Sequence, residues 1–175
     1  RKSFMNNHRR MTGQSMLLML FVLMSACHSN LNEVVINSPN NTNTVTILID
    51  EGNLLYKVNH ENKPIILPSK LGFIFKDGLS LSDSFKIRDV QFSQLDETWQ
   101  QPWGSVKAIR NHYEEAIIYL SSVSDPENKI DLMIRAYDDG IALRYYVQSL
   151  GENEEVVITD ELTEFNLAED AQSWW

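Results

Sequence analysis

The stretch RAYDDGIALRYYV, residues 135–147, decides the fold of this chain. Runs of aliphatic and aromatic residues flank Asp138, Asp139 and Gly140. Two such runs separated by an Asp/Gly turn predict a β-hairpin. The adjacent carboxylates raise a second question, since they could be an acid/base pair, a metal site or only a turn.

The apolar pattern of the two runs predicts the hairpin register, because side chains alternate between the faces of a strand. We take Asp139-Gly140 as a two-residue loop, in which Gly140 is able to take positive φ. The cross-strand pairs are then Ala136 with Leu143, Ile134 with Tyr145 and Leu132 with Val147. One face of the hairpin becomes wholly apolar, as expected for a strand pair that covers a core.

The other face of this register places Arg135 opposite Arg144. Two like charges directly across a strand pair are unfavourable. We therefore predict a carboxylate beside these arginines.

The two aspartates themselves are best interpreted as turn residues. In a calcium loop with Gly140 at the sixth position, Arg135 would be first and Tyr146 twelfth, where oxygen ligands are required. Neighbouring turn carboxylates usually stay solvated, which also makes an acid/base pair a weak interpretation.

Other strand signals recur along the chain, with Gly, Asn, Asp and Pro turns between them. They cover residues 45–49, 54–59, 71–75, 85–92, 114–123, 129–137, 141–148 and 156–159. Short strands at such regular spacing predict an all-β, antiparallel β-sandwich. The sequence has no Gly-rich phosphate loop and no Cys/His metal spacing.

The first 27 residues have the layout of a signal peptide. Arg9 and Arg10 precede the apolar run 16–24, and small residues follow it. Nine apolar residues span roughly 13 Å as a helix, whereas a bilayer span needs about 20 residues. The polar residues 28–44 are expected to be a linker and a first strand. Because the chain starts at Arg1 and stops at Trp175, we expect a fragment of a longer protein.

Cys27 is the only cysteine, so no disulfide is expected. It follows residues that resemble a bacterial lipobox, with Met24 where that motif usually has leucine. We expect lipidation at Cys27 and a periplasmic or outer-membrane location. Cleavage after Ala26 by an ordinary signal peptidase, giving a free periplasmic protein, is the alternative.

The chain is acidic, with a net charge of −9. Residues 1–27 hold four basic and no acidic residues, which leaves 11 basic against 24 acidic residues and a net charge of −13 in the rest. A surface of this sign is a poor match for nucleic acid. Contact with a membrane is expected only through the lipid anchor.

Two segments contain candidate site residues. Trp99 and Trp103 lie among acids and amides in residues 96–104, a mixture suited to stacking on a sugar or to packing under a neighbouring domain. His112 is the best titratable candidate, although most such histidines have structural roles. We predict carbohydrate contact at Trp99, Trp103 and His112, and no metal ligand in this chain. The acidic residues 159–170 could form a surface loop or an edge that faces another domain.

Taken in order, several of these segments resemble the amino-terminal domain of glycoside hydrolase family 97. The segments are Leu71-Gly72, residues 96–99 with Trp103-Gly104, residues 109–113, residues 135–140 with 143–145, and residues 158–166 with 171–175. The resemblance covers about residues 45–175.

The resemblance implies the first part of a β-super-sandwich of the galactose-mutarotase-like type, followed by a (β/α)₈ barrel that carries the catalytic carboxylates. The implied enzyme is an α-glucosidase or α-galactosidase that takes α-linked oligosaccharides and binds calcium in its full-length form. The catalytic residues are then expected beyond Trp175, and none is assigned within this chain. Specificity between glucoside and galactoside, and retaining or inverting stereochemistry, stay open.

A second hypothesis is a stand-alone surface lipoprotein that binds glycans through Trp99 and Trp103. A purely structural, tethered β-domain is a third.

Overall fold

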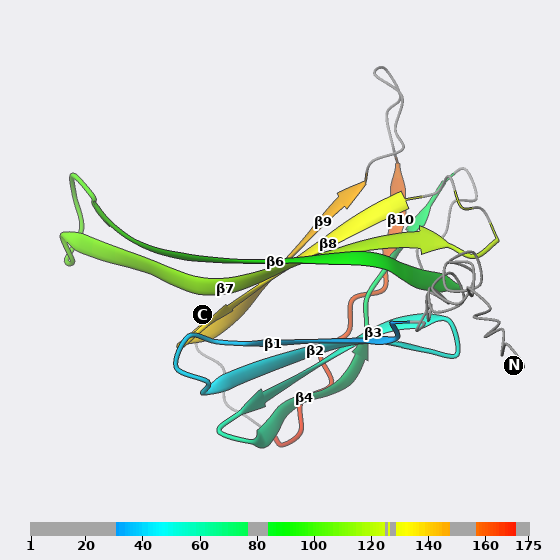
Figure 1. Ribbon diagram of the computed structural model, residues 1–175, viewed down its shortest axis with the longest axis horizontal. Coiled ribbons are helices and arrows are strands. Elements are labelled where there is room, and N and C mark those ends of the chain that lie inside the picture. Colours follow the sequence, from blue (N-terminus) through cyan, green and yellow to red (C-terminus); the bar gives the residue numbers. More distant parts are fainter. Residues whose placement is uncertain (1–30, 77–83, 125, 127–128, 148–156, 171–175) are drawn as a thin grey trace, which may run out of the picture.

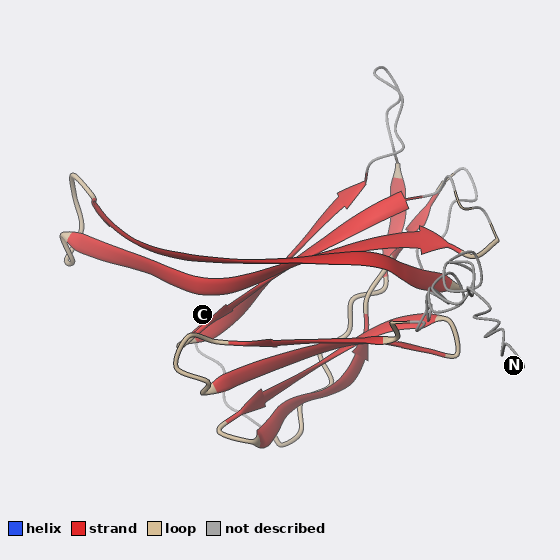
Figure 2. Ribbon diagram, in the orientation of Figure 1, coloured by secondary structure: helices blue, strands red, loops and turns tan. Residues whose placement is uncertain are grey.

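The computed structural model describes residues 31–76, 84–124, 126, 129–147 and 157–170. Within these ranges every regular element is a β-strand and all the strand pairs are antiparallel (Figure 2). This part of the chain has no helix that is long and apolar enough to cross a membrane. The antiparallel β-sandwich expected from the sequence is confirmed.

The first sheet contains β1 (Glu33–Asn37), β2 (Asn43–Asp50), β3 (Asn53–His60) and β4 (Lys63–Lys70), side by side in chain order. The β2–β3 and β3–β4 turns are the residue pairs 51–52 and 61–62, all with positive φ. Two-residue turns of this backbone type match the twist of the strands they join. β4 was not predicted, because Pro64 and Pro68 weaken the strand signal. The β3–β4 register shifts around both prolines, and prolines are tolerated at such irregularities.

The second sheet contains β6 (Phe85–Gln100), β7 (Ala108–Ser122), β8 (Lys129–Tyr137) and β9 (Gly140–Val147). β6 and β7 are longer than the sequence predicted, because pairing continues from Phe92↔Ala116 out to Gln100↔Ala108. Their outer halves project beyond both sheets as a long two-stranded arm, which lies at the left of Figure 1.

The core lies between the two sheets, where β1 and β2 pack over β7 and β8. Alternate residues of these strands point inward, as one-sided burial requires. The buried apolar side chains are Val34, Ile36, Val45, Ile47, Leu54, Tyr56, Val58, Leu71, Phe75, Phe85, Ala116, Ile118, Leu120, Ile130, Leu132, Ile134 and Ala136. Burial of each larger aliphatic side chain contributes about 1.5–3 kcal/mol before entropy is counted.

A third, smaller group of strands closes one side of the sandwich. β5 (Phe73–Phe75) pairs with β10 (Ile158–Glu161), and the residues after β10 run along β4 through backbone hydrogen bonds. Rings tie this layer to both sheets: Phe73 packs edge-on against Tyr145 at 4.7 Å between centroids, and Phe165 packs against Tyr56 at 6.3 Å.

The β8–β9 register differs from the predicted one by two positions. The turn is Asp138-Asp139, and the pairs are Ala136↔Ile141, Ile134↔Leu143, Leu132↔Tyr145 and Ile130↔Val147. The expected apolar face is present, because a shift of two residues keeps every side chain on its face. The predicted place of Gly140 in the turn was wrong, since Gly140 is the first residue of β9 and pairs with Tyr137.

The same shift corrects the predicted pair of arginines. Arg135 lies opposite Ala142, and Arg144 lies opposite Met133. The predicted carboxylate is nevertheless present beside Arg135, because Glu115 of β7 is its direct cross-strand partner.

Candidate functional site

The Asp138-Asp139 turn joins the two sheets of the sandwich. It lies against the β1–β2 turn, where the backbone N–H of Asn40 donates to Asp138 Oδ1 at 2.9 Å. The Thr42 hydroxyl also donates to the carbonyl oxygen of Asp138, at 3.3 Å. The sequence prediction of a turn is confirmed, and Asp138 has a structural task beyond the turn itself.

Asn43 is the centre of this junction. Its side-chain amide Nδ2 donates to the carbonyl oxygens of Tyr137 at 2.8 Å and Asp138 at 3.1 Å. Both partners only accept, so Asn43 Oδ1 must face His60, 2.7 Å from its Nδ1. Since an amide oxygen cannot donate, His60 Nδ1 carries the proton of this bond. Asn43 itself is 6% exposed, and its contacts with Tyr137, Asp138 and His60 are part-buried.

Sequence reasoning missed Asn43 and His60, although a signal for the pair was present. The turn recognised at residues 50–53 places Asp50 opposite Asn53. Continuing that register along β2 and β3 sets Asn43 opposite His60, as the structure shows. The two residues are 17 positions apart in the sequence, so an interpretation based on local motifs does not find the contact.

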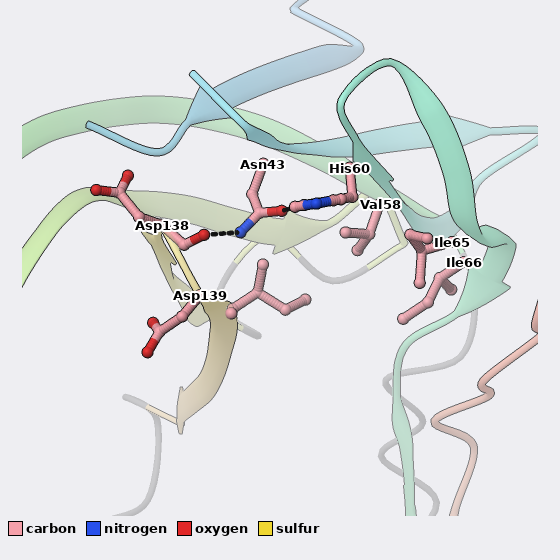
Figure 3. Close-up of a pocket in the computed structure, with 9 residues that line it drawn as sticks. Asn43, Val58, His60, Ile65, Ile66, Asp138 and Asp139 are labelled. Atoms are coloured by element: carbon pink, nitrogen blue, oxygen red, sulfur yellow. Dashed lines mark hydrogen bonds between the residues drawn. The ribbon is translucent and has the colours of Figure 1, made fainter. Parts of the chain in front are cut away.

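A cavity of about 350 Å³ opens beside this junction (Figure 3). Val58, Ile65, Ile66 and Ile141 form its apolar wall, and the polar groups of Asn43, His60 and the Asp138-Asp139 turn lie at its rim. Concave apolar sites with a few polar groups are the usual form of small-molecule sites.

A second polar cluster lies on the outer face of the second sheet, which contains β6 to β9. Glu115, whose side chain is 10% exposed, accepts from Arg135 Nε at 2.6 Å and from the Ser93 hydroxyl at 3.1 Å. The Arg135 guanidinium also lies 4.3 Å from the centroid of the Tyr113 ring, a cation–π contact. The Glu115 hydrogen bond raises the pKa of Arg135. These groups satisfy one another, so the cluster fixes the β7–β8 pairing.

The predicted carbohydrate residues all lie on the arm, and the structure does not bring them together. Trp99 pairs with Ile109 on one face, whereas His112 pairs with Asp96 on the opposite face. Trp103 lies in the loop between β6 and β7 and is 82% exposed. Carbohydrate contact at these residues stays a prediction, but one ligand cannot bridge Trp99 and His112 through the ribbon.

The carboxylates of the arm are also paired. Arg110 Nε and Nη2 each lie 2.8 Å from an oxygen of Asp96, which is a bidentate ion pair. This hydrogen bonding with Arg110 lowers the pKa of Asp96. Asn111 donates to Glu97 at 3.0 Å on the other face. Asp96 is therefore held ionised, the opposite of what a general acid at neutral pH requires.

Tyr145 contributes a measurable pH dependence. Burial raises the pKa of its phenol from 10.0 to about 12. The unfolded chain would release this proton near pH 10, so the stabilisation is complete below pH 10 and is lost as the pH rises towards 12. The loss should be about 2 kcal/mol. We expect Tyr145→Phe to remove this part of the alkaline loss, measured as urea midpoints between about pH 9 and pH 11.5.

Tyr146→Phe is the matched control, because the neighbouring Tyr146 is 56% exposed. It should leave the alkaline profile unchanged. An identical alkaline loss in wild type and Tyr145→Phe would show that Tyr145 does not titrate differently in the folded state.

Among the described residues, no three His, Cys, Asp or Glu side chains are close enough together to hold a metal ion. Glu115 and Asp96 are committed to arginines. The described side chains thus do not by themselves fit the calcium site that the family resemblance implies. Cys27 and Trp174-Trp175 lie outside the described residues.

Comparison with known families gives one match that covers most of the chain. Residues 36–175 match the model of the glycosyl-hydrolase 97 N-terminal domain. Among curated proteins, the chain is 25% identical over 131 residues to a retaining α-galactosidase of Bacteroides thetaiotaomicron, covering 75% of this chain and 19% of that enzyme.

Solved structures show the same architecture. A glycoside hydrolase family 97 enzyme from Pseudoalteromonas sp. strain K8, in complex with panose or with acarbose, is 30% identical with a TM-score of 0.72, over 77% of this chain and 20% of that one. A β-arabinopyranosidase at 22% identity and a TM-score of 0.70, over 81% of this chain and 24% of its own, supports the fold alone. The chain thus spans about a fifth of the length of the relatives it matches.

Proposed function

The chain belongs to glycoside hydrolase family 97, and we propose that it is part of a glycosidase that hydrolyses α-glucosides or α-galactosides. The observation that carries the proposal is the family match over residues 36–175. The retaining α-galactosidase among its relatives and the panose and acarbose complexes of another support α-linked oligosaccharides as substrates.

We propose that this domain does not carry out the chemistry. Glycoside hydrolysis usually needs two carboxyl groups on either side of the scissile bond, one of them protonated as an acid. Asp96 and Glu115 are bound to arginines and form part of the scaffold. The role of the domain is to support a catalytic barrel and to form one wall of the substrate pocket.

The calcium ion belongs to the proposal only for the full-length enzyme. When bound, calcium would supply a positive charge held by oxygen ligands. No residue of this chain is assigned to it.

Export is a further part of the proposal, supported by the charged start and apolar run of residues 1–27. In this proposal, Cys27 is acylated, and the lipid anchors the protein to a membrane surface on the periplasmic side. Cys27→Ala should move the full-length protein from the membrane to the soluble periplasmic fraction, measured by fractionation and immunoblotting. Unchanged membrane association would contradict the anchor, and Ser25→Ala is the matched control.

Hydrolysis of aryl α-glucosides and aryl α-galactosides by the purified full-length protein tests the enzymatic proposal. Absence of hydrolysis, together with quenching of tryptophan fluorescence by panose, would instead support the glycan-binding lipoprotein.

A further inference from the structure

The arm, defined as residues 93–113, extends beyond the two packed sheets of the sandwich. It consists of the outer halves of β6 and β7 and the loop that joins them (Figure 1). The first sheet covers β6 and β7 only as far as Phe92 and Glu114. These two residues line a recess together with residues of β1 and the β1–β2 turn. Beyond that point, most of the arm's side chains are exposed.

An isolated two-stranded ribbon is only marginally stable in water. This arm is reinforced on both faces by side-chain pairs across the strands. Asp96 with Arg110 forms the bidentate ion pair on one face, and Glu97 with Asn111 forms a hydrogen bond on the other. The arm is therefore shaped before it meets a partner, which lowers the entropy cost of binding.

The tip of the arm is also built with a defined shape. Gly104 has a φ of 113°, a backbone conformation that disfavours other residues, and a Cβ there would lie 2.6 Å from Gln101 Nε2. The Gln101 backbone N–H donates to the Lys107 carbonyl at 3.0 Å, and its side chain donates to Val106. This tight loop presents Trp103 outward.

The apolar groups at this end are unusually open. Trp103 is 82% exposed, Val106 54% and Trp99 48%. The formal charges of the arm cancel, with two acidic and two basic residues, although the chain as a whole has a net charge of −9. The arm has no net charge and exposes its indoles, although the chain is acidic. These properties suit contact with another protein surface, because interface cores are depleted of charge and rich in tryptophan.

We propose that the arm docks onto the catalytic part of the same polypeptide, with Trp103 seated in its surface. This inference rests on the proposed function, since it takes the catalytic barrel as the occupant. About four fifths of the length of the relatives lies outside the matched region, which leaves enough chain for a catalytic barrel.

A sugar fits the arm less well than a protein surface does. Sugar recognition needs free polar groups beside an aromatic face. Here Asp96 and Glu97 are already bonded to Arg110 and Asn111, and Gln101 is bonded within its own loop. A second copy of the chain is the other competitor, which concentration dependence can separate.

The test is hydroxyl-radical footprinting of Trp103 in the full-length protein, native and in urea, with light scattering to establish the monomer. If docking takes Trp103 from 82% exposed to the exposure of an interface core, its native oxidation should slow by about fivefold. Equal rates in both states would overturn the proposal. So would protection that disappears on dilution of an oligomer to monomer, or protection that requires added panose.

A variant gives an independent reading of the same contact. In the full-length protein, Trp103→Ala should speed amide hydrogen exchange in residues 96–99 and 109–112 by about tenfold, because the docked arm opens more often. Leu67→Ala, an exposed apolar residue of β4, is the control and should leave exchange in the arm unchanged. Unaltered exchange in Trp103→Ala would contradict docking through the indole.

The two hypotheses fail in different ways. A full-length protein that hydrolyses no α-glycoside but protects Trp103 would refute the enzymatic proposal and leave intramolecular docking. An active enzyme with an unprotected Trp103 would refute docking alone.

Discussion

Replacement of Asn43 by leucine is expected to destabilise this domain by about 2–4 kcal/mol. Leucine has nearly the same shape, so little packing is lost. The change removes the donor to the Tyr137 and Asp138 carbonyls and the acceptor of the His60 Nδ1 proton. The three hydrogen bonds are part-buried, so the loss of each costs about 0.5–1.5 kcal/mol, and water that reaches the adjacent cavity reduces the total.

Hydrogen exchange in the full-length protein is the measurement for this variant, because it reports on one domain at a time. Amides of β2 and β8 should lose protection together, since Asn43 joins one sheet to the other. Asn53→Leu is the control: Asn53 makes only an exposed 3.3 Å bond to Asp50 and should change protection little. Equal effects of the two substitutions would show that the Asn43 junction does not hold the sheets together.

The sequence predicts the faces of the β8–β9 hairpin but not its register. Registers that place Asp139-Gly140 or Asp138-Asp139 in the turn put the same side chains on the core face. Hydrophobic patterning therefore cannot choose between them. The choice depends on the turn itself, where Asp138 is held by the β1–β2 turn about a hundred residues away in sequence.

The same limit explains why Glu115 could be anticipated only as an unnamed carboxylate. The carboxylate was expected because Arg135 was placed opposite Arg144, a pair that the structure does not form. Which residue lies beside Arg135 depends on the β7–β8 pairing, which the sequence does not give. Strand β4 was missed for a related reason. Its prolines oppose a strand locally, and the pairing with β3 and with residues 164–168 that overrides this preference is long-range.

The arm shows the same kind of error, since residues of a strand were not predicted as strand. Asp96 and Glu97 have low strand propensity, and Pro102 follows shortly after them. The pairing of β6 with β7 continues through these residues because each polar side chain has a cross-strand neighbour, such as Asp96 with Arg110. The residues that weaken the local signal for a strand are those that stabilise the ribbon.

The largest expected effect is the difference in activity between the full-length protein and residues 28–175. In our account these residues shape and support the enzyme but hold no catalytic pair of carboxyl groups. Removal of everything after Trp175 should then abolish hydrolysis rather than reduce it, because glycoside cleavage needs both carboxyl groups.

The most direct test is a paired assay of both proteins on aryl α-glucosides and aryl α-galactosides, with the aryl β-glycosides as controls. We expect hydrolysis of an α-glycoside by the full-length protein and none above background by residues 28–175. Hydrolysis by residues 28–175, or no α-glycoside hydrolysis by the full-length protein, would contradict this expectation.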